Sequence, residues 1–155
     1  MLFLRKATMN DMNLIFEWAN DPVVLNNSFH SETIPYDSHK QWYTSIMQND
    51  SVLQYILMDD EIPVGQIRLN IQDGDAEIGY SIASEHRGKG YGRRILQLVA
   101  EEVAKNHSEI RTLVAKVKPD NTVSKKLFES EGYEMKYSCY TRKPMKSCGS
   151  GDDIQ

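Results

Sequence analysis

The sequence is poor in cysteine and has no long hydrophobic run. Cys139 and Cys148 are the two cysteines in 155 residues, too few for a disulfide framework and without a matched set of metal ligands nearby. We therefore interpret both as ordinary thiols and expect no metal site. No apolar run approaches the roughly 18 residues of a membrane span, and the N-terminal MLFLRKATMNDM lacks the apolar core of a signal peptide. We therefore expect a cytoplasmic protein that does not bind membranes.

An excess of positive charge is also missing. Eighteen Lys and Arg stand against 22 Asp and Glu, which gives a net charge of −4. The basic residues concentrate locally in 86–94 and 116–126, whereas a phosphate-backbone surface needs a broad basic face. This balance excludes nucleic acid as the expected partner. With 40% hydrophobic residues the chain can bury one sizeable core, so we expect one domain over 1–145 and a polar tail over 146–155.

The first half of the chain alternates between helical and strand patterns. The segment LFLRKAT predicts a strand, and Asn10 or Asp11 can cap a helix that ends at Asn20–Pro22. Ser38 can cap a second helix that carries Trp42, Ile46 and Met47 on its apolar face. Alternating segments with turn residues between them then predict an antiparallel meander, at 52–60, 62–73 and 75–83.

In the second half, apolar residues recur at helical spacing through Lys105, and 111–117 reads as a short buried strand. Asn121 can cap the next helix and Gly132 can stop it. We expect 133–145 to supply one or two final strands.

Three glycines stand at alternate positions in SEHRGKGYGRRIL, residues 84–96. A strand that runs through a glycine turn into a helix presents unpaired backbone N–H groups at the positive end of the helix dipole, which favours an anion. The P-loop pattern is absent, and the dinucleotide fingerprint GxGxxG fails because position 93 is Arg. Taken alone, the spacing is also compatible with a tight turn that carries solvated arginines.

The pattern Arg87-x-x-Gly90-x-Gly92 resembles the acyl-CoA-binding motif Q/R-x-x-G-x-G/A of the GCN5-related N-acetyltransferase (GNAT) family. The segment AEIGYSIASEHRGKGYG resembles the fourth strand of that family, and VKPDNTVSKKLFESEGY resembles its later segment, where an Asn precedes a helix ending in xGF or xGY. The resemblance covers most of the chain. It implies an α+β GNAT fold with a twisted, mixed and mostly antiparallel sheet of six to seven strands and about four flanking helices.

The resemblance also implies that acetyl-CoA is the acyl donor and places its contacts. Backbone amides of Gly88 to Arg93 would cradle the pyrophosphate, with added charge from Arg87 and Lys89, and the end of the fourth strand would pair with the pantetheine arm. Asn121 matches a family Asn near the pantetheine, and it can equally be a plain helix cap. The coenzyme-binding residues implied are Ser81, Ile82, Ala83, Arg87, Gly88, Lys89, Gly90, Tyr91, Gly92, Arg93, Asn121 and Phe128.

Acetyl transfer to nitrogen needs a route for proton removal, because an alkylamine with a pKa near 10.4 is almost entirely protonated at neutral pH. Glu77 matches the fourth-strand Glu that serves as general base in several family members; the alternative is an exposed strand carboxylate. The tyrosine that protonates the departing thiolate in many members is replaced here by Phe128. Tyr133 is our candidate substitute, with Tyr137 and Tyr140 as alternatives.

The acceptor side is expected within residues 17–43, which carry W-x-N-D-P, then N-S-F and then H-x-x-W. This pattern resembles acetyltransferases of bacterial nucleotide-sugar pathways, such as the pseudaminic acid route, which acetylate the 4-amino group of a nucleotide-linked amino-deoxy sugar. Two aromatic residues of this stretch, Trp18 and Trp42, are equally compatible with a helix core. The acceptor-binding residues implied are Trp18, Asn20, Asn27, Ser28, His39 and Trp42.

The expected function is acetyl transfer from acetyl-CoA to the primary amine of a small molecule, by direct attack in a ternary complex. A nucleotide-linked 4-amino-4,6-dideoxy sugar is the expected acceptor. Two alternatives stay open: a protein N-terminal acetyltransferase of the ribosomal-protein type, and a non-catalytic acyl-CoA-binding module. A homodimer is also left open.

Overall fold

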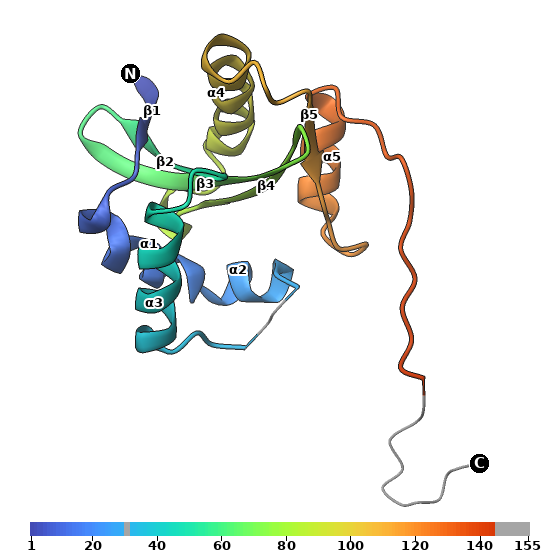
Figure 1. Ribbon diagram of the computed structural model, residues 1–155, viewed down its shortest axis with the longest axis horizontal. Helices are drawn as coiled ribbons and strands as arrows, with labels where there is room; N and C mark the ends of the chain where they lie inside the picture. The colour runs from blue at the N-terminus through green and yellow to red at the C-terminus, as the bar shows by residue number, and fades with distance from the viewer. Residues whose placement is uncertain (30–31, 145–155) are drawn as a thin grey trace, which may run out of the picture.

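The computed structural model describes residues 1–29 and 32–144. Within them one sheet lies between helices on its two faces (Figure 1). Its five strands follow the order β1-β2-β3-β4-β5, with antiparallel pairing except between β4 and β5, which are parallel. The expected mixed, mostly antiparallel sheet is confirmed. The strands are β1 (Leu2–Lys6), β2 (Val52–Asp59), β3 (Ile62–Gln72), β4 (Asp75–Ile82) and β5 (Thr112–Ala115).

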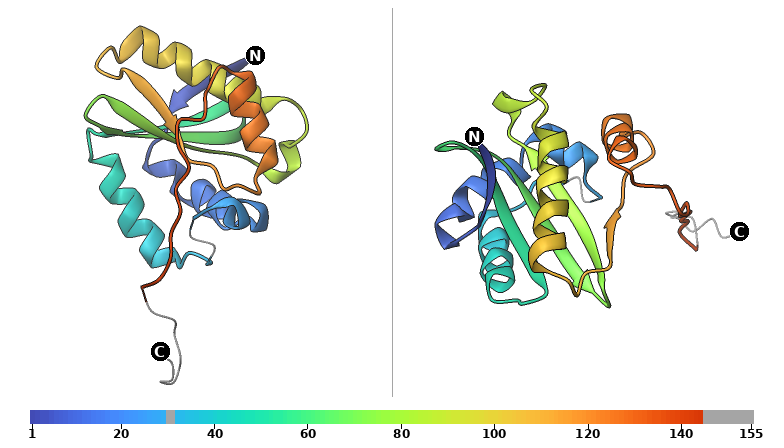
Figure 2. Two further views of the ribbon diagram at one scale, coloured as in Figure 1. Left: turned by 90° about the vertical axis from the view of Figure 1, so that its right-hand side faces the viewer. Right: turned by 90° about the horizontal axis from the view of Figure 1, so that it is seen from above.

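Five α-helices surround the sheet in the described chain. Three of them cover one face, a fourth crosses the opposite face, and the last lies beside β5 (Figures 1 and 2). Short 3-10 turns precede the first and fourth helices, at Met9–Asp11 and Ser84–His86. The helices are α1 (Met12–Ala19), α2 (Pro22–Asn27), α3 (Tyr36–Met47), α4 (Tyr91–Asn106) and α5 (Thr122–Ser130).

Strand alternation divides the apolar residues between two cores. On β4, Ala76 and Ile78 are buried in the larger core, together with Ile95 and Val99 of α4. The smaller core lies between the sheet and the helices α1 and α3, and contains Ile15, Tyr43, Ile46, Ile56 and Met58. Because successive side chains of a strand point to opposite faces, the odd-numbered β4 residues face the α1–α3 side. The polar residues Glu77 and Ser81 therefore face the α1–α3 side and not the larger core.

The two edges of β4 have different lengths of pairing. On one edge β4 pairs with β3 as far as Gly65 and Ile82, whereas on the other edge its pairing with β5 ends at Ile78 and Ala115. Residues 79–82 therefore extend past β5 and leave backbone groups open on that edge. We call this open end of β4, where β5 has diverged, the splay; the family resemblance implies that the pantetheine arm pairs there.

The expectation of six to seven strands is wrong, because residues 133–143 form no strand and β5 is the edge of the sheet. Alternation makes a segment compatible with a strand, but a strand also requires a partner edge. Met135, Tyr137 and Tyr140 of this segment are exposed. The segment leaves α5 as an extended chain (Figure 2). The expected polar tail over 146–155 lies outside the described residues.

The helix α2 is an addition to the expected elements. Asp21 caps it, because its Oδ1 accepts hydrogen bonds from the amides of Val23 and Val24 at 2.9 and 3.3 Å, and Pro22 occupies the favoured first position. The motif expected to end a helix thus also begins one. The next helix, α3, begins at Tyr36, before the expected cap at Ser38. No helix of the described chain is long and apolar enough to cross a bilayer.

Candidate functional site

The glycine turn forms an open cradle at the start of α4. Gly88 and Gly90 have φ values of 79° and 84°, a left-handed conformation that side chains other than glycine adopt at a cost. A Cβ placed on either residue would meet no atom within 4 Å, so the space in front of both is open. No side chain caps α4, and its first amides have no intrahelical acceptor. The cradle therefore fits the pyrophosphate of a coenzyme.

Gly92 has a different role from its two neighbours. A Cβ there would stand 3.0 Å from Cδ2 of Leu127 on α5, closer than ordinary van der Waals contact. The missing side chain lets α4 and α5 approach each other. Gly92 therefore positions the helices that flank the cleft.

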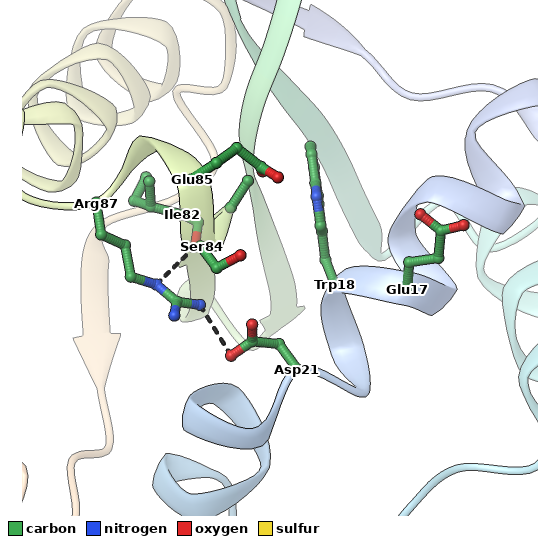
Figure 3. Close-up of a pocket in the computed structure, with 8 residues that line it drawn as sticks. Glu17, Trp18, Asp21, Ile82, Ser84, Glu85 and Arg87 are labelled. Atoms are coloured by element: carbon green, nitrogen blue, oxygen red, sulfur yellow. Dashed lines mark hydrogen bonds and ion pairs between the residues drawn. The ribbon is translucent and has the colours of Figure 1, made fainter.

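Arg87 binds protein groups and links the cradle to the N-terminal helices. Its guanidinium donates to Oδ1 of Asp21 at 3.1 Å and, through Nε, to the carbonyl of Ile82 at 3.0 Å (Figure 3). Burial opposes ionisation of Asp21, but the hydrogen bonds from Arg87 and from the α2 amides outweigh it and lower the pKa of Asp21. The carboxylate that caps α2 therefore also holds the turn after β4. That Arg87 contributes charge to the coenzyme stays a prediction.

The other basic and aromatic residues of the turn differ in their availability. Lys89 is exposed, and no ion pair within the described chain holds it. Arg93 lies 3.4 Å from Oε2 of Glu131, and the hydroxyl of Tyr91 donates to Oδ2 of Asp59 at 2.5 Å. Tyr91 thus ties the first turn of α4 to the end of β2, whereas Lys89 is available to an anion at the cradle.

A cavity of about 180 Å³ lies between α1 and the turn that follows β4. Figure 3 shows the ring of Trp18 standing across from Glu85, with Asp21 below it. The cavity is next to the open end of β4, where the family resemblance places the pantetheine arm. It is lined by Glu17, Trp18, Asp21, Ile82, Ala83, Ser84, Glu85 and Arg87.

The three residues expected to meet the pantetheine arm, at and just after the end of β4, direct their backbone groups to different sides. The amide of Ala83 donates to the carbonyl of Val64 at 2.8 Å, so its N–H is used within the sheet. Because hydrogen-bonding direction alternates along a strand, Ser81 also faces β3, whereas Ile82 faces the open edge. Ser81 is 9% exposed, and its hydroxyl accepts a hydrogen bond from Nε2 of Gln66 at 3.1 Å.

Glu77 lies near the start of β4, on the α1–α3 side. Its Oε1 is 3.0 Å from Nζ of Lys116, and both side chains are about half exposed. Glu77 raises the pKa of Lys116 through a hydrogen bond and its charge. Four residues separate Glu77 from Ser81, which is about 13 Å along a strand. A base at this place reaches an acceptor at the splay through bridging water more readily than by direct contact.

Phe128 and Tyr133 pack together beside β4. Phe128 is 6% exposed and meets the rings of Tyr80 and Tyr133 edge-on, at centroid distances of 5.7 and 5.0 Å. The hydroxyl of Tyr133 is buried and has no hydrogen-bond partner in the described chain. Burial raises the pKa of Tyr133 to about 12, so the phenol stays protonated at neutral pH and is a weaker acid than an ordinary tyrosine. The other candidates, Tyr137 and Tyr140, are exposed.

The predicted cap of α5 is confirmed. Oδ1 of Asn121 accepts from the amide of Ser124 at 3.2 Å. Ser124 also bonds the hydroxyl of Tyr80 through Oγ at 3.0 Å, which joins α5 to β4 across the open edge. A coenzyme contact by Asn121 stays a prediction.

The residues expected on the acceptor side differ in exposure and in the groups they contact. Asn20 shapes the loop before α3, because its side chain exchanges two hydrogen bonds with the backbone of Ile34, at 2.7 and 3.1 Å. His39 is 2% exposed and bonds the carbonyl of Met12 at 3.0 Å, so the structure does not bring it to the cavity. Trp18 lines the cavity, and Trp42 is 37% exposed. Asn27 and Ser28 end α2.

A family model described as the acetyltransferase (GNAT) domain matches residues 1–134. The chain belongs to the GNAT acetyltransferase family. It is therefore an acetyl-CoA-dependent N-acetyltransferase of the GNAT type. Its open glycine cradle and splayed β4 fit that donor. No group of three or more His, Cys, Asp or Glu side chains within 1–29 and 32–144 is arranged to hold a metal ion.

Relatives and solved structures agree with this assignment. The chain is 28% identical to the uncharacterized N-acetyltransferase p20 of Bacillus licheniformis over 86% of this chain and 79% of that protein. It resembles an aminoglycoside acetyltransferase AAC(6')-Ib in complex with coenzyme A, with a TM-score of 0.76, 20% identity and coverage of 88% and 86%. It also resembles spermidine N-acetyltransferase from Vibrio cholerae with CoA and spermine, with a TM-score of 0.76, 21% identity and coverage of 84% and 79%. The two structures establish the GNAT fold.

Sequence reasoning did not single out two residues that lie on strands next to the candidate site. Tyr80 is an apolar strand position by pattern, and its bond to α5 depends on the fold. Arg68 lies on β3 opposite Gly79, and its guanidinium stands over the ring of Trp42 at 5.1 Å. The signal for Arg68 was a charged residue within an apolar alternation, which by itself predicts only a solvent-facing position.

Proposed function

We propose that this GNAT enzyme acetylates the primary amine of a nucleotide-linked 4-amino-4,6-dideoxy sugar, by direct attack of the amine on acetyl-CoA in a ternary complex. The observation that carries this proposal is the cavity beside the open end of β4, which has Trp18 on one wall and the turn over residues 82–87 on the other. A flat aromatic ring suits a sugar ring or a base. Relatives in fold bind small amines, since one AAC(6')-Ib structure holds ribostamycin and the Vibrio cholerae enzyme holds spermine.

When bound, acetyl-CoA supplies the acetyl group as a thioester. The amides of the first α4 turn and of the Gly88–Gly90 cradle would hold its pyrophosphate, with Lys89 adding charge. The open edge of β4 at Ile82 would pair with the pantetheine arm as an added strand. These contacts fix the position of the acyl group next to the cavity.

The chain's own groups would handle the two protons of the reaction. Glu77 takes a proton from the acceptor amine through water, because its carboxylate lies on the acceptor face of β4. Tyr133, whose buried hydroxyl has no partner in the described chain, would protonate the departing thiolate and regain a proton from the newly acylated nitrogen through solvent. A thiolate with a pKa near 8.5 is a tolerable leaving group, so the tyrosine accelerates the reaction without being essential to it.

The test compares kcat/KM for the UDP-linked 4-amino-4,6-dideoxy sugar with kcat/KM for the free sugar and for short peptides with unblocked N-termini. We expect the nucleotide sugar to be the best acceptor. A peptide that reacts faster would overturn the acceptor assignment and favour an N-terminal acetyltransferase. Coenzyme binding without turnover of any amine would favour a non-catalytic module.

A further inference from the structure

Arg68 lies on the α1–α3 side of the sheet, the face on which we propose that the acceptor binds. No ion pair of the described chain involves its guanidinium. It lies in the middle of β3, paired in register with Gln54 of β2 and Gly79 of β4. No carboxylate or hydrogen-bond acceptor of the described chain contacts its guanidinium. The nearest carboxylate along the face belongs to Glu77, which is engaged with Lys116 at 3.0 Å.

The surroundings of Arg68 hold its side chain over the sheet. The guanidinium carbon is 5.1 Å from the ring centroid of Trp42, and Nη2 lies 3.4 Å from the place where a Cβ of Gly79 would stand. Burial lowers the pKa of Arg68, and the charge of Glu77 opposes this effect. Stacking on an indole occupies the face of a guanidinium and leaves its N–H edge free. That edge is the part that binds a phosphate or carboxylate through two parallel hydrogen bonds.

A partly buried cation without an anion is costly, because desolvation is not offset by a partner. The protein places this charge beside Gly79, the residue whose missing side chain leaves room above β4. Gly79 is two residues, or about 7 Å of strand, from Ser81 at the splay. One acceptor molecule can therefore place an anionic group at Arg68 and an amine at the splay.

On the basis of the proposed function, we infer that Arg68 is the anion-binding group of the acceptor site and takes the phosphate attached to the sugar. In a 4-amino sugar nucleotide the amine and the phosphate lie on opposite sides of one sugar ring. This separation matches an amine at the end of β4 and a phosphate at Arg68. The site then selects acceptors that carry a negative charge one ring away from the amine, and it disfavours polyamines.

The experiment measures kcat and KM for the UDP-linked sugar and for the free sugar with wild-type protein, Arg68→Gln and Arg68→Lys. We expect Arg68→Gln to raise KM for the nucleotide sugar at least tenfold and to leave KM for the free sugar and Kd for acetyl-CoA unchanged. Arg68→Lys should keep part of the effect, because it retains the charge and loses the paired donors. Lys105→Gln, which removes an exposed charge at the far end of α4, is the matched control and should change neither KM.

An equal rise in KM for both sugars in Arg68→Gln would overturn the inference. A lower melting temperature of this variant with unchanged KM values would also overturn it, because that result indicates a structural role for Arg68, such as a bond to Gln54. If neither sugar is acetylated, the proposed function has failed, and calorimetry of UDP and of glutamate with the coenzyme-bound protein tests Arg68 separately. Binding of UDP that is lost in Arg68→Gln supports the phosphate site. If wild-type protein binds glutamate but not UDP, Arg68 binds a carboxylate and the phosphate inference is overturned. If it binds neither anion, the inference is overturned as well.

Discussion

At the scale of single residues, the three glycines of the turn illustrate how one motif combines separate physical requirements. Gly88 and Gly90 are needed for a left-handed backbone in front of an open space, whereas Gly92 is needed because Leu127 occupies the place of its side chain. The sequence predicted all three as coenzyme residues. The contact between Gly92 and α5 could not be foreseen, because it depends on how two distant helices pack.

Replacing Gly90 by Leu should weaken acetyl-CoA binding at least tenfold, about 1.4 kcal/mol, because the new side chain enters the cradle. Gly132→Leu is the matched control, since Gly132 has a φ of 91° and equally open surroundings. Both variants should lose a similar amount of stability, about 1–2 kcal/mol, from left-handed strain. Calorimetry measures Kd, and urea unfolding measures the strain. Unchanged affinity in folded Gly90→Leu would remove the cradle from the coenzyme site.

Glu77→Gln should lower kcat/KM about 100-fold near neutral pH, because the acceptor amine loses its proton acceptor. Activity of this variant should recover as pH rises and more of the amine is deprotonated. Lys116→Met separates the carboxylate from its ion pair, and it should cost less than about tenfold because Glu77 remains. Steady-state kinetics across pH provide the measurement. If the two variants lose activity equally, the ion pair rather than the carboxylate matters.

At the scale of elements, the sequence predicted those parts whose partners are near in the chain. The meander over 52–83 was confirmed within a residue or two at its ends, because each strand pairs with its neighbour across a short turn. The helix after the glycine turn was likewise confirmed. The strands expected at 133–145 were wrong, since no partner edge could be read from alternation alone. Helix α2 was missed because its six residues are too short for a periodic signal.

The candidate site followed the same division. Its cradle is a continuous stretch of chain, so sequence sufficed to place it. Arg68 and Trp42 meet only because α3 packs on the sheet, where it contacts β2. His39 was expected at the acceptor, yet it lies in the core between α1 and α3, where its ring packs against those of Phe16 and Tyr43.

The contact between α1 and α3 should weaken as pH falls. Burial lowers the pKa of His39, although its bond to the carbonyl of Met12 opposes this. A lowered pKa means that the stabilising neutral form is fully present above the ordinary value of 6.5 and is lost as pH falls from there through the folded-state pKa. The free energy of unfolding should therefore decrease between pH 7.5 and 5, and it should decrease less in His39→Phe. Urea unfolding at both pH values gives the comparison, and equal slopes would contradict the assignment to His39.

At the scale of the whole molecule, β5 and α5 are joined to the rest of the domain by fewer backbone pairs than the other strands are. β1 to β4 pair in order and antiparallel, whereas β5 is joined to β4 over four residue pairs, Asp75–Ile78 with Thr112–Ala115, and α5 lies beside that edge (Figure 2). The hydrogen bond of the Tyr80 hydroxyl and the close approach of Gly92 to Leu127 are among the contacts that join α5 to β4 and α4. Between these contacts lies the open edge of β4. A homodimer stays a prediction, which light scattering after size exclusion can check.

A coenzyme bound at the open edge of β4 should stabilise β5 and α5 as well as the cradle. At 100 times Kd, acetyl-CoA should contribute about 2.7 kcal/mol, or about 5–10 °C in melting temperature for a domain of this size. Hydrogen exchange should slow at the start of α4 and also over 112–130, because the pantetheine arm pairs with β4 where β5 has diverged. Adenosine 3′,5′-bisphosphate, which lacks that arm, should slow exchange only around the cradle. If the full coenzyme protected no more of the chain than this fragment, the donor would not lie between β4 and β5, and the acceptor cavity beside Trp18 would lose its connection to the acyl group.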